Sequence, residues 1–465
     1  MSTCLDEKGP QYSDWTARII LYAPYLLCLV FYFWISRKLG LDVSSGAPDE
    51  IMRALLHEAI SQGNILPSGY DQEVIYHLGY WSYAFYPQLL PAYLSALFMT
   101  ASRLLGMSEG AVFMNGRLAS IVFSILALYF TSRTTYRLAT SYFNSEKEAA
   151  LVRSLTVIYL GFWPQYAFLS SYMNNDIAAF CGAAIIIDAL SQGVRTGWRR
   201  GNTVQLALGI IIAALSYWNA YPFILISVPI YLITLARQGC SAKEKRCLVV
   251  LIVLIVIIGT APFYLTNIIR YHDLVGIRTF NARYQQWLDE GNEVLRKPFS
   301  GGLVALIMSS DYVSLTVKSF VGVFGYMYIY YPDGVYSFYL LSLFAGVLGF
   351  AVRRKQFSRN NDAIVILWTA VMAACLIVVG LSVYYTLSAD YQPQGRYIIY
   401  LLLPFVIMAC LGWASLIREP SAQESPKKRV GFTAKLAAAS SCYISICLWM
   451  FWSASQLYGW AGVAF

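Results

Sequence analysis

The chain has 465 residues, of which 58% are hydrophobic and 13% charged, and its mean hydropathy is +0.54. Soluble proteins carry about 25% charged residues, so this composition excludes an ordinary soluble enzyme, a disordered chain and a nucleic-acid-binding domain. A polytopic membrane protein remains. The net charge of +9 must then be read loop by loop, because basic residues mark the cytoplasmic side of such proteins.

A membrane-spanning helix needs about 20 mostly apolar residues, and eleven runs of this kind are predicted. They cover residues 17–35, 111–132, 154–170, 176–192, 203–217, 220–236, 248–267, 335–352, 363–383, 397–417 and 435–456. A further apolar stretch, 88–105, is expected to lie in the outer interface without crossing. The predicted fold class is therefore all-α and polytopic, with interfacial helices in the first long outer loop.

Five linkers between these runs are basic: 133–153, 195–200, 237–246, 353–359 and 418–435. They share one side of the membrane only if 88–105 does not cross. Because basic loops stay in the cytoplasm, the amino terminus is expected inside and the carboxyl terminus outside. The outer segments are then 36–110, 171–175, 268–334 and 384–396, with a short turn at Trp218–Pro222.

The sharpest polar motif, Gly46–Glu50 (GAPDE), follows the first run. Its proline and two acids indicate the start of a helix, where acids favour the helix dipole. Asp49, Arg53 and His57 then share one helix face, because they are four residues apart. Two interpretations stay open: a site that gathers an acid, a guanidinium and an imidazole, or a surface helix that Asp49 caps while it pairs with Arg53.

The stretch 70–86 is polar and aromatic and contains Asp71, Glu73, His77 and Tyr83. Such a composition is typical of a carbohydrate-binding loop, but also of an interfacial aromatic belt without a ligand.

A tight outer turn holds Asn174, Asn175 and Asp176. Asp176 is explained by capping of the following helix, although three polar side chains at an apolar membrane edge also favour a site.

The segment 384–396 contains Gln394 and one basic residue, Arg396, at the start of a run. A cation there opposes the helix dipole, so an anionic partner is expected: Asp390 or a lipid phosphate. The loop 268–334 contributes Arg270 and Arg278 among nearly balanced charges, most of which are expected to be solvated.

Together these motifs resemble the GT-C class of polytopic membrane glycosyltransferases, in particular a bacterial branch with a Pro-Asp-Glu motif in the first outer loop. The resemblance runs from about residue 17 to 417. Its segments are Asp49-Glu50, Asn174–Asp176, Asn267–Asp273, Ser319–Met327 and Gln394–Tyr397. Such enzymes take a sugar from a polyprenyl-phosphate carrier and transfer it on the exoplasmic face.

The resemblance implies a role for each candidate residue. Asp49 activates the acceptor, with Glu50 beside it as a second catalytic candidate. Members of the class often carry a lysine in the turn that here reads Tyr217–Pro222. Since this chain has none there, the donor phosphate is expected on Arg396, Arg270, Arg278 or Arg53. The substrate-binding candidates are His57, Asp71, His77, Tyr83, Asn174, Asn175, Asp176 and Gln394.

The implied partners are a polyprenyl-phosphate-linked sugar donor, a glycan or glycolipid acceptor such as O-antigen, and membrane lipids, without nucleic acid. The location is a bacterial inner membrane with the site on the periplasmic face. Residues 1–417 form the catalytic module and 418–465 a basic linker with the last helix. Burial is expected to raise the pKa of Asp49. No cofactor is certain, and a divalent cation is possible on Asp49, His57, Asp71, Glu73, His77 or Asp176.

Two alternatives remain open. A secondary transporter or lipid-glycan flippase predicts charges in the middle of spans and repeated halves. Asp188 is the candidate charge, although its place near the inner end of a run favours local pairing. A non-catalytic membrane scaffold predicts that every acid of the outer loops is replaceable.

Overall fold

The computed structural model describes residues 15–40, 46–140, 146–357, 362–417 and 426–457. These residues form α-helices and short 3-10 turns, with two isolated bridges and no strand. The α-helices are α1 (Trp15–Lys38), α2 (Glu50–Ser61), α3 (Leu89–Leu104), α4 (Glu109–Gly116), α5 (Leu118–Thr140), α6 (Glu146–Gly161), α7 (Pro164–Leu169), α8 (Asp176–Thr196), α9 (Arg200–Ala214), α10 (Tyr221–Arg237), α11 (Ala242–Tyr271), α12 (Ile277–Asp289), α13 (Gly302–Met308), α14 (Ser310–Val321), α15 (Asp333–Phe357), α16 (Asp362–Ser388), α17 (Leu402–Ile417) and α18 (Pro426–Leu457). The 3-10 turns are η1 (Gln72–Val74), η2 (Leu78–Tyr80), η3 (Tyr83–Phe85), η4 (Trp218–Ala220) and η5 (Gly395–Leu401).

Helix α8 is the central helix of the bundle, and it packs against α5, α9, α10 and α16. Small residues make this close packing possible, as is common between membrane helices. A methyl group at Gly182 would overlap the backbone of Ala213 in α9, so the two helices touch through their backbones. At the edge of the bundle, α11 packs on α9 and exposes most of its apolar surface, as a lipid-facing helix does.

Seven helices of the described chain are long and apolar enough to span a membrane, or eight if the bent pair α13–α14 counts as one span. The chain is therefore an integral, multi-pass membrane protein, although the predicted count of eleven is not confirmed. The predicted run 111–132 lies within one candidate span, Glu109–Thr140, which comprises α4 and α5. The predicted run 154–170 is broken, because α6 ends at Gly161 and α7 begins at Pro164.

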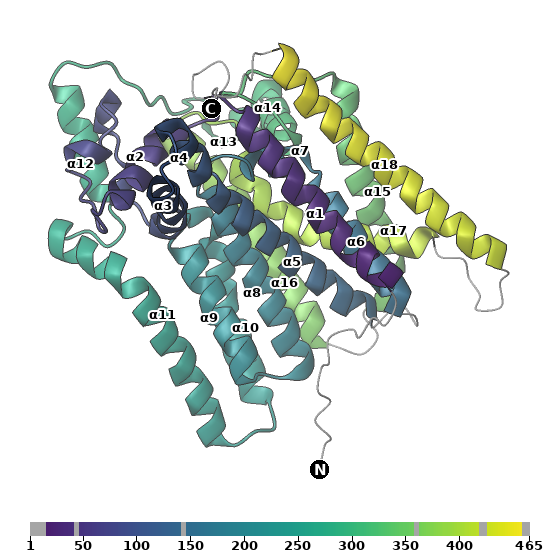
Figure 1. Cartoon of the computed structure of the whole chain (residues 1–465). Coiled ribbons are helices and arrows are strands. Elements are labelled where there is room, and N and C mark those ends of the chain that lie inside the picture. Colours follow the sequence, from purple (N-terminus) through teal and green to yellow (C-terminus); the bar gives the residue numbers. More distant parts are fainter. Residues whose placement is uncertain (1–14, 41–45, 141–145, 358–361, 418–425, 458–465) are drawn as a thin grey trace.

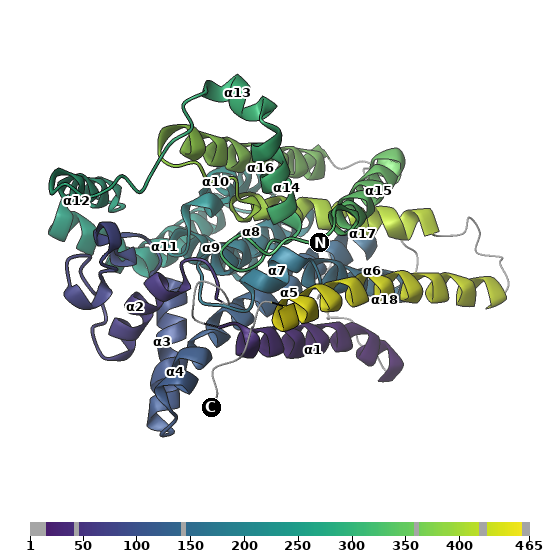
Figure 2. The same ribbon diagram turned by 90° about the horizontal axis from the view of Figure 1, so that it is seen from above.

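The predicted outer segments gather at one end of the bundle. Figure 1 shows α2, α3, α4 and α12 together at that end, while the connection between α10 and α11 lies at the opposite end. Helix α3 is seen end-on in Figure 1 and lengthwise in Figure 2, so it lies across the direction of α9 and α10. This orientation fits the interfacial position expected for 88–105.

Some predictions concern residues outside the described part of the chain. The boundary of the two predicted domains falls at residues 418–425, which the structure does not describe. The same holds for the amino-terminal residues 1–14 and for part of the basic linkers, at 141–145 and 358–361.

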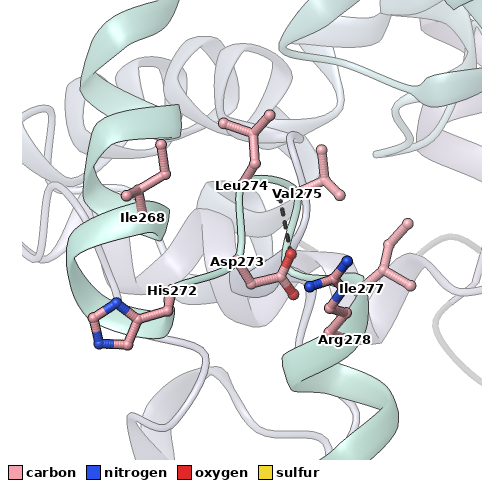
Figure 3. Close-up of a pocket in the computed structure, with 7 residues that line it drawn as sticks. All are labelled: Ile268, His272, Asp273, Leu274, Val275, Ile277 and Arg278. Atoms are coloured by element: carbon pink, nitrogen blue, oxygen red, sulfur yellow. Dashed lines mark hydrogen bonds between the residues drawn. The ribbon is translucent and has the colours of Figure 1, made fainter.

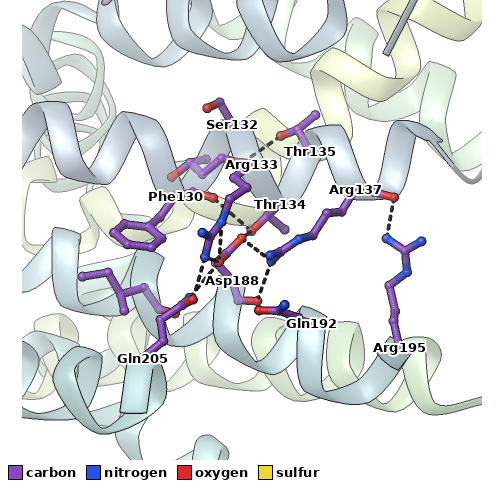
Figure 4. Close-up of polar contacts among 12 residues, drawn as sticks. Phe130, Ser132, Arg133, Thr134, Thr135, Arg137, Asp188, Gln192, Arg195 and Gln205 are labelled. Carbon is purple, nitrogen blue, oxygen red and sulfur yellow. Dashed lines mark hydrogen bonds and ion pairs between the residues drawn. The ribbon is translucent and has the colours of Figure 1, made fainter. Parts of the chain in front are cut away.

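A buried group of charges, the Asp188 cluster, joins α5, α8 and α9 (Figure 4). The Oδ1 atom of Asp188 accepts hydrogen bonds from Thr134 Oγ1 at 3.0 Å and Arg137 Nη1 at 2.9 Å. Its Oδ2 atom accepts from Arg133 Nε at 3.0 Å and Gln205 Nε2 at 2.7 Å. The pairing expected for Asp188 is thus confirmed, and both of its oxygens are satisfied.

Candidate active site

Asp49 stands just before α2 in a left-handed backbone conformation, with φ at 62°. Few side chains adopt this conformation, and it concentrates at functional sites. As the N-cap residue it makes no side-chain capping bond, so its carboxylate is free to turn away from the helix. Its Oδ2 atom instead accepts a hydrogen bond from Arg396 Nη2 at 2.8 Å and lies 3.7 Å from Arg53 Nη2. The capping expected in the surface-helix interpretation is therefore wrong, whereas the pairing of Asp49 with Arg53 that it included is observed.

The side chain of Glu50 forms a buried ion pair with Arg117, whereas that of Asp49 contacts Arg396. Its two oxygens accept hydrogen bonds from Arg117 Nε and Nη2, both at 2.8 Å, and one also accepts from the backbone N–H of Met173 at 2.8 Å. Arg117 is fully buried and also donates to the carbonyls of Leu39 and Gly40 at 2.9 and 3.2 Å. Glu50 is 2% exposed. Both oxygens of Glu50 are thus engaged by these partners, and its predicted catalytic role stays a prediction.

Arg396 enters the site from η5. The turn packs so closely on α14 that a methyl group at Gly395 would overlap the backbone of Phe320. In addition, Gly395 N donates to Ser319 Oγ at 2.6 Å. Asp390, one of the two partners expected for Arg396, instead accepts from the backbone N–H of Lys297 at 3.1 Å. The anion beside Arg396 is Asp49.

The turn before α8 brings a second acid, Asp176, to the same site. Asn174, not Asp176, caps the helix, because its Oδ1 atom accepts from Ile177 N at 3.0 Å. The Nδ2 atom of Asn175 donates to the carbonyl of Ser216 at 3.1 Å. Asp176 is buried within electrostatic reach of Arg53 and Arg396. We name Asp49, Arg53, Asp176 and Arg396 the Asp49 centre.

The Asp49 centre contains buried polar atoms without hydrogen-bond partners among the described residues. They are Nε and Nη1 of Arg396, Nε of Arg53 and Oδ1 of Asp176, with Asn175 Oδ1, Tyr172 OH and Gln394 Oε1 beside them. A buried polar group without a partner costs about 1–3 kcal/mol. Several in one place indicate a site that a polar ligand completes.

The arginines of the centre shift the pKa values of Asp49 and His57. Burial opposes ionisation of Asp49, but the Arg396 and Arg53 guanidiniums outweigh it, so the pKa of this carboxyl lies below its ordinary value. The expectation of a raised pKa is therefore wrong. Burial, assisted by Arg53, lowers the pKa of His57 to about 3, so this imidazole is neutral.

Aromatic side chains surround the two arginines. The Arg53 guanidinium lies over the ring of Tyr83 at 4.7 Å, and that of Arg396 lies over the ring of Tyr397 at 5.2 Å. Arg53 Nη1 also donates to Gln88 Oε1 at 3.2 Å. Asp49 keeps 25% of its side-chain surface accessible, whereas Arg396 keeps 7%. A substrate can thus reach the carboxylate while the cations below stay fixed.

Other candidates lie outside this group. Asp71 accepts from Ser68 N at 2.8 Å and Asn64 Nδ2 at 3.1 Å, which makes it part of a surface turn. Glu73 accepts from the same Asn64, and His77 is exposed. None of the contacts of the Asp49 centre involves them.

Arg270 and Arg278 also lie elsewhere, at the outer end of α11 and the start of α12. Arg270 Nη1 donates to the carbonyl of Leu66 at 2.8 Å. Arg278 lines a cavity of about 700 Å³ with His272, Asp273 and four apolar residues (Figure 3). Asp273 is engaged by the backbone N–H groups of Val275 and Thr279. Neither arginine contacts the Asp49 centre.

The predicted metal ligands are not gathered. Within the described residues, no three His, Cys, Asp or Glu side chains lie close enough together to hold a metal ion. Two guanidiniums already neutralise Asp49, and their charge opposes binding of a divalent cation there.

Sequence reasoning missed two kinds of residue at the site. Arg117 lies inside a predicted span and carries no local signal that it pairs with Glu50. Tyr172 and Tyr217 approach the centre, since both interact electrostatically with Asp176 and Arg396. Their positions next to Asn174 and in the outer turn before α10 were the available signal.

A comparison with solved structures identifies the fold. The structure of ArnT from Cupriavidus metallidurans bound to undecaprenyl phosphate matches 96% of this chain and 71% of its own, with a TM-score of 0.53 and 13% identity. The chain therefore has the GT-C fold. The archaeal oligosaccharyltransferase AglB from Archaeoglobus fulgidus, solved with an inhibitory peptide and a dolichol-phosphate, matches 95% of this chain and 56% of its own, with a TM-score of 0.49 and 15% identity. The sequence matches no protein-family model and no curated protein.

Proposed function

We propose that this GT-C protein is a membrane glycosyltransferase that moves a sugar from a polyprenyl-phosphate carrier to a hydroxyl of a surface glycan, such as O-antigen, on the periplasmic face of a bacterial inner membrane. Asp49 is the general base, and Arg396 and Arg53 hold the phosphate. Glu50, Arg270 and Arg278 have no direct part in the reaction.

One observation carries this proposal. Of the three guanidinium nitrogens of Arg396, Nη2 donates a hydrogen bond to Asp49, whereas Nε and Nη1 are buried without partners among the described residues. These N–H groups lie on different edges of the guanidinium, and each can donate a charge-assisted hydrogen bond to a phosphate oxygen. A phosphate held there lies beside the one carboxylate of the centre that a substrate can reach.

The reaction needs few groups. The acceptor oxygen attacks the anomeric carbon, the bond from that carbon to the phosphate oxygen breaks, and the acceptor proton passes to Asp49. Attack from the side opposite the phosphate inverts the anomeric centre. The departing polyprenyl phosphate takes the electron pair, and the guanidiniums stabilise its charge. No acid is required, because a phosphate leaves as an anion.

Donor binding also prepares the base. Without a donor, the guanidiniums of Arg396 and Arg53 hold the pKa of Asp49 low and make it a weak proton acceptor. A phosphate that shares Arg396 withdraws part of this stabilisation, so the proton affinity of Asp49 rises. Asp176, buried within electrostatic reach of both guanidiniums, is a positioning residue.

The proposal is tested with purified protein, polyprenyl-phosphate sugars and a panel of glycan acceptors. Replacing Asp49 with Asn keeps the hydrogen bond to Arg396 but removes the base, so we expect turnover to fall about 10²–10⁴-fold. Binding of undecaprenyl phosphate, measured by native mass spectrometry, should remain. Near-normal turnover of Asp49→Asn would refute the role of the carboxylate.

The matched control is Asp289→Asn on the exposed face of α12, which removes an outer carboxylate that accepts a hydrogen bond from Gln285. It should leave turnover unchanged. A transporter is disfavoured by Asp188, whose oxygens are all held by fixed partners.

A further inference from the structure

An extended segment after α12 brings another arginine toward the site. The hydroxyl of Tyr284 accepts the backbone N–H groups of Leu295 and Arg296 at 2.9 and 3.2 Å. One residue later, Lys297 N donates to Asp390 at 3.1 Å. The segment is thus fixed between α12 and the loop that leads to Arg396.

The Arg296 side chain lies in an aromatic cage. Its guanidinium is 4.6 Å from the ring centre of Trp81, 4.8 Å from Phe280 and 5.2 Å from Tyr284. These contacts stabilise a cation and fix its direction. Packing alone would explain the stacking.

Packing does not explain the hydrogen-bonding groups. The Nε atom of Arg296 and the Nε1 atom of Trp81 are both buried without a partner among the described residues. Nor does any carboxylate of the described chain form an ion pair with Arg296. Two unpaired donors and an unneutralised charge therefore stand on an aromatic surface.

This surface is continuous with the Asp49 centre. Arg296 interacts with the hydroxyl of Tyr86, and the ring of Tyr86 lies 6.1 Å from that of Tyr83, which stacks on Arg53. On the other side, Tyr385 is within electrostatic reach of both Arg296 and Asp49. Aromatic faces with N–H donors are a common way to bind sugar rings.

We propose that Arg296, Trp81 and Tyr86 form the acceptor site and that Arg296 selects an acidic glycan, one that carries a carboxylate or a phosphate. The inference rests on the proposed function, because it assigns the acceptor of the same reaction. The anionic group pairs with the guanidinium and a sugar ring stacks on the aromatic surface, which places a neighbouring hydroxyl near Asp49.

Binding of defined oligosaccharides to the full-length protein in detergent tests this inference without a donor. The probes are a tetrasaccharide that alternates glucuronic acid with N-acetylglucosamine, a neutral tetrasaccharide of N-acetylglucosamine, and a phosphorylated mannose trisaccharide with its unphosphorylated form. We expect at least one acidic probe to bind about tenfold more tightly than its neutral match, since a charged hydrogen bond contributes that much. The two acidic probes distinguish carboxylate from phosphate.

Arg296→Gln should reduce this preference to about one, and Arg296→Lys should retain part of it, which separates a lost charge from a misfolded protein. Arg283→Gln is the matched control, because Arg283 also stacks on two rings, Tyr70 and Tyr80, and also has an unpaired Nε atom. Equal binding of acidic and neutral probes by the wild type, or a preference that survives Arg296→Gln, would overturn the inference. Absence of sugar transfer by the wild type would count against the proposed function alone.

Discussion

The Asp49 centre and the Asp188 cluster are built from the same kinds of residue and differ in one respect. Each places two arginines beside a carboxylate, and each uses helix α8, which contributes Asp176 to one and Asp188 to the other. In the Asp188 cluster both carboxylate oxygens have at least two donors. In the Asp49 centre, by contrast, two nitrogen atoms of Arg396 have no hydrogen-bond partner among the described residues.

The comparison teaches that burial of charge does not by itself mark a site. A buried charged group whose hydrogen bonds are all made stabilises the packing of helices. A buried polar group without a partner lowers the stability of the fold, and it is found where a ligand supplies the missing hydrogen bond. Stability should therefore depend mainly on Asp188, and activity mainly on the Asp49 centre.

The largest expected effect on stability comes from Asp188→Asn. It leaves the half-buried Arg133 and Arg137 beside a neutral amide, and loss of one partner from a buried ion pair costs about 3–5 kcal/mol, which is an upper bound here. Thermal unfolding in detergent measures this loss. Asp49→Asn serves as the comparison and should change the unfolding temperature far less. Equal losses for the two variants would remove the distinction between the clusters.

The next effect concerns turnover in the Arg396→Ala variant. Loss of a preorganised donor to a developing anion reduces kcat about 10²–10³-fold, and binding of undecaprenyl phosphate should weaken as well. Arg278→Ala, in the cavity beside α12, should leave both unchanged. If Arg278→Ala instead weakened phosphate binding as much as Arg396→Ala, the phosphate would belong at the outer end of α11.

The smallest effect is a dependence of stability on pH through His57. Its pKa in the folded protein is lowered to about 3, while an unfolded histidine titrates near 6.5. Below about pH 6.5 the unfolded chain therefore binds a proton that the folded chain does not, and stability falls as the pH falls, by roughly 1 kcal/mol per unit.

The variant His57→Gln should flatten this slope between pH 6.5 and pH 5, as followed by denaturant unfolding at each pH. Asp49 does not interfere in that range, because its lowered pKa keeps it ionised there, and its own contribution is lost only at lower pH. An unchanged slope in His57→Gln would place the protonation elsewhere.

Much of this arrangement was predictable from the sequence. The four-residue spacing predicted that Asp49 and Arg53 come together, as they do although Asp49 precedes α2, and the sidedness of the loops predicted that Asp176 and Arg396 lie at the same end. These predictions succeeded because helix periodicity and the distribution of basic loops are local or additive properties.

What failed depended on long-range pairing. Glu50 and Arg117 are 67 residues apart, and no local pattern distinguishes the buried acid from Asp49, its more accessible neighbour. Arg296 was included among solvated loop charges because the loop is nearly neutral. Its cage is assembled from Trp81 and Phe280, which lie on separate segments. The direction of the Asp49 pKa also required knowledge of which arginines reach it.

The ion pair between Glu50 and Arg117 has a consequence for biogenesis. During synthesis, the segment that carries Asp49 leaves the ribosome before Arg117, and well before Met173, whose backbone is 123 residues from Glu50. The acid cannot take its final orientation until α5 has been inserted and the turn ahead of α8 has closed over it. A nascent chain arrested before that turn would therefore lack the backbone contact from Met173 that completes the setting of Glu50.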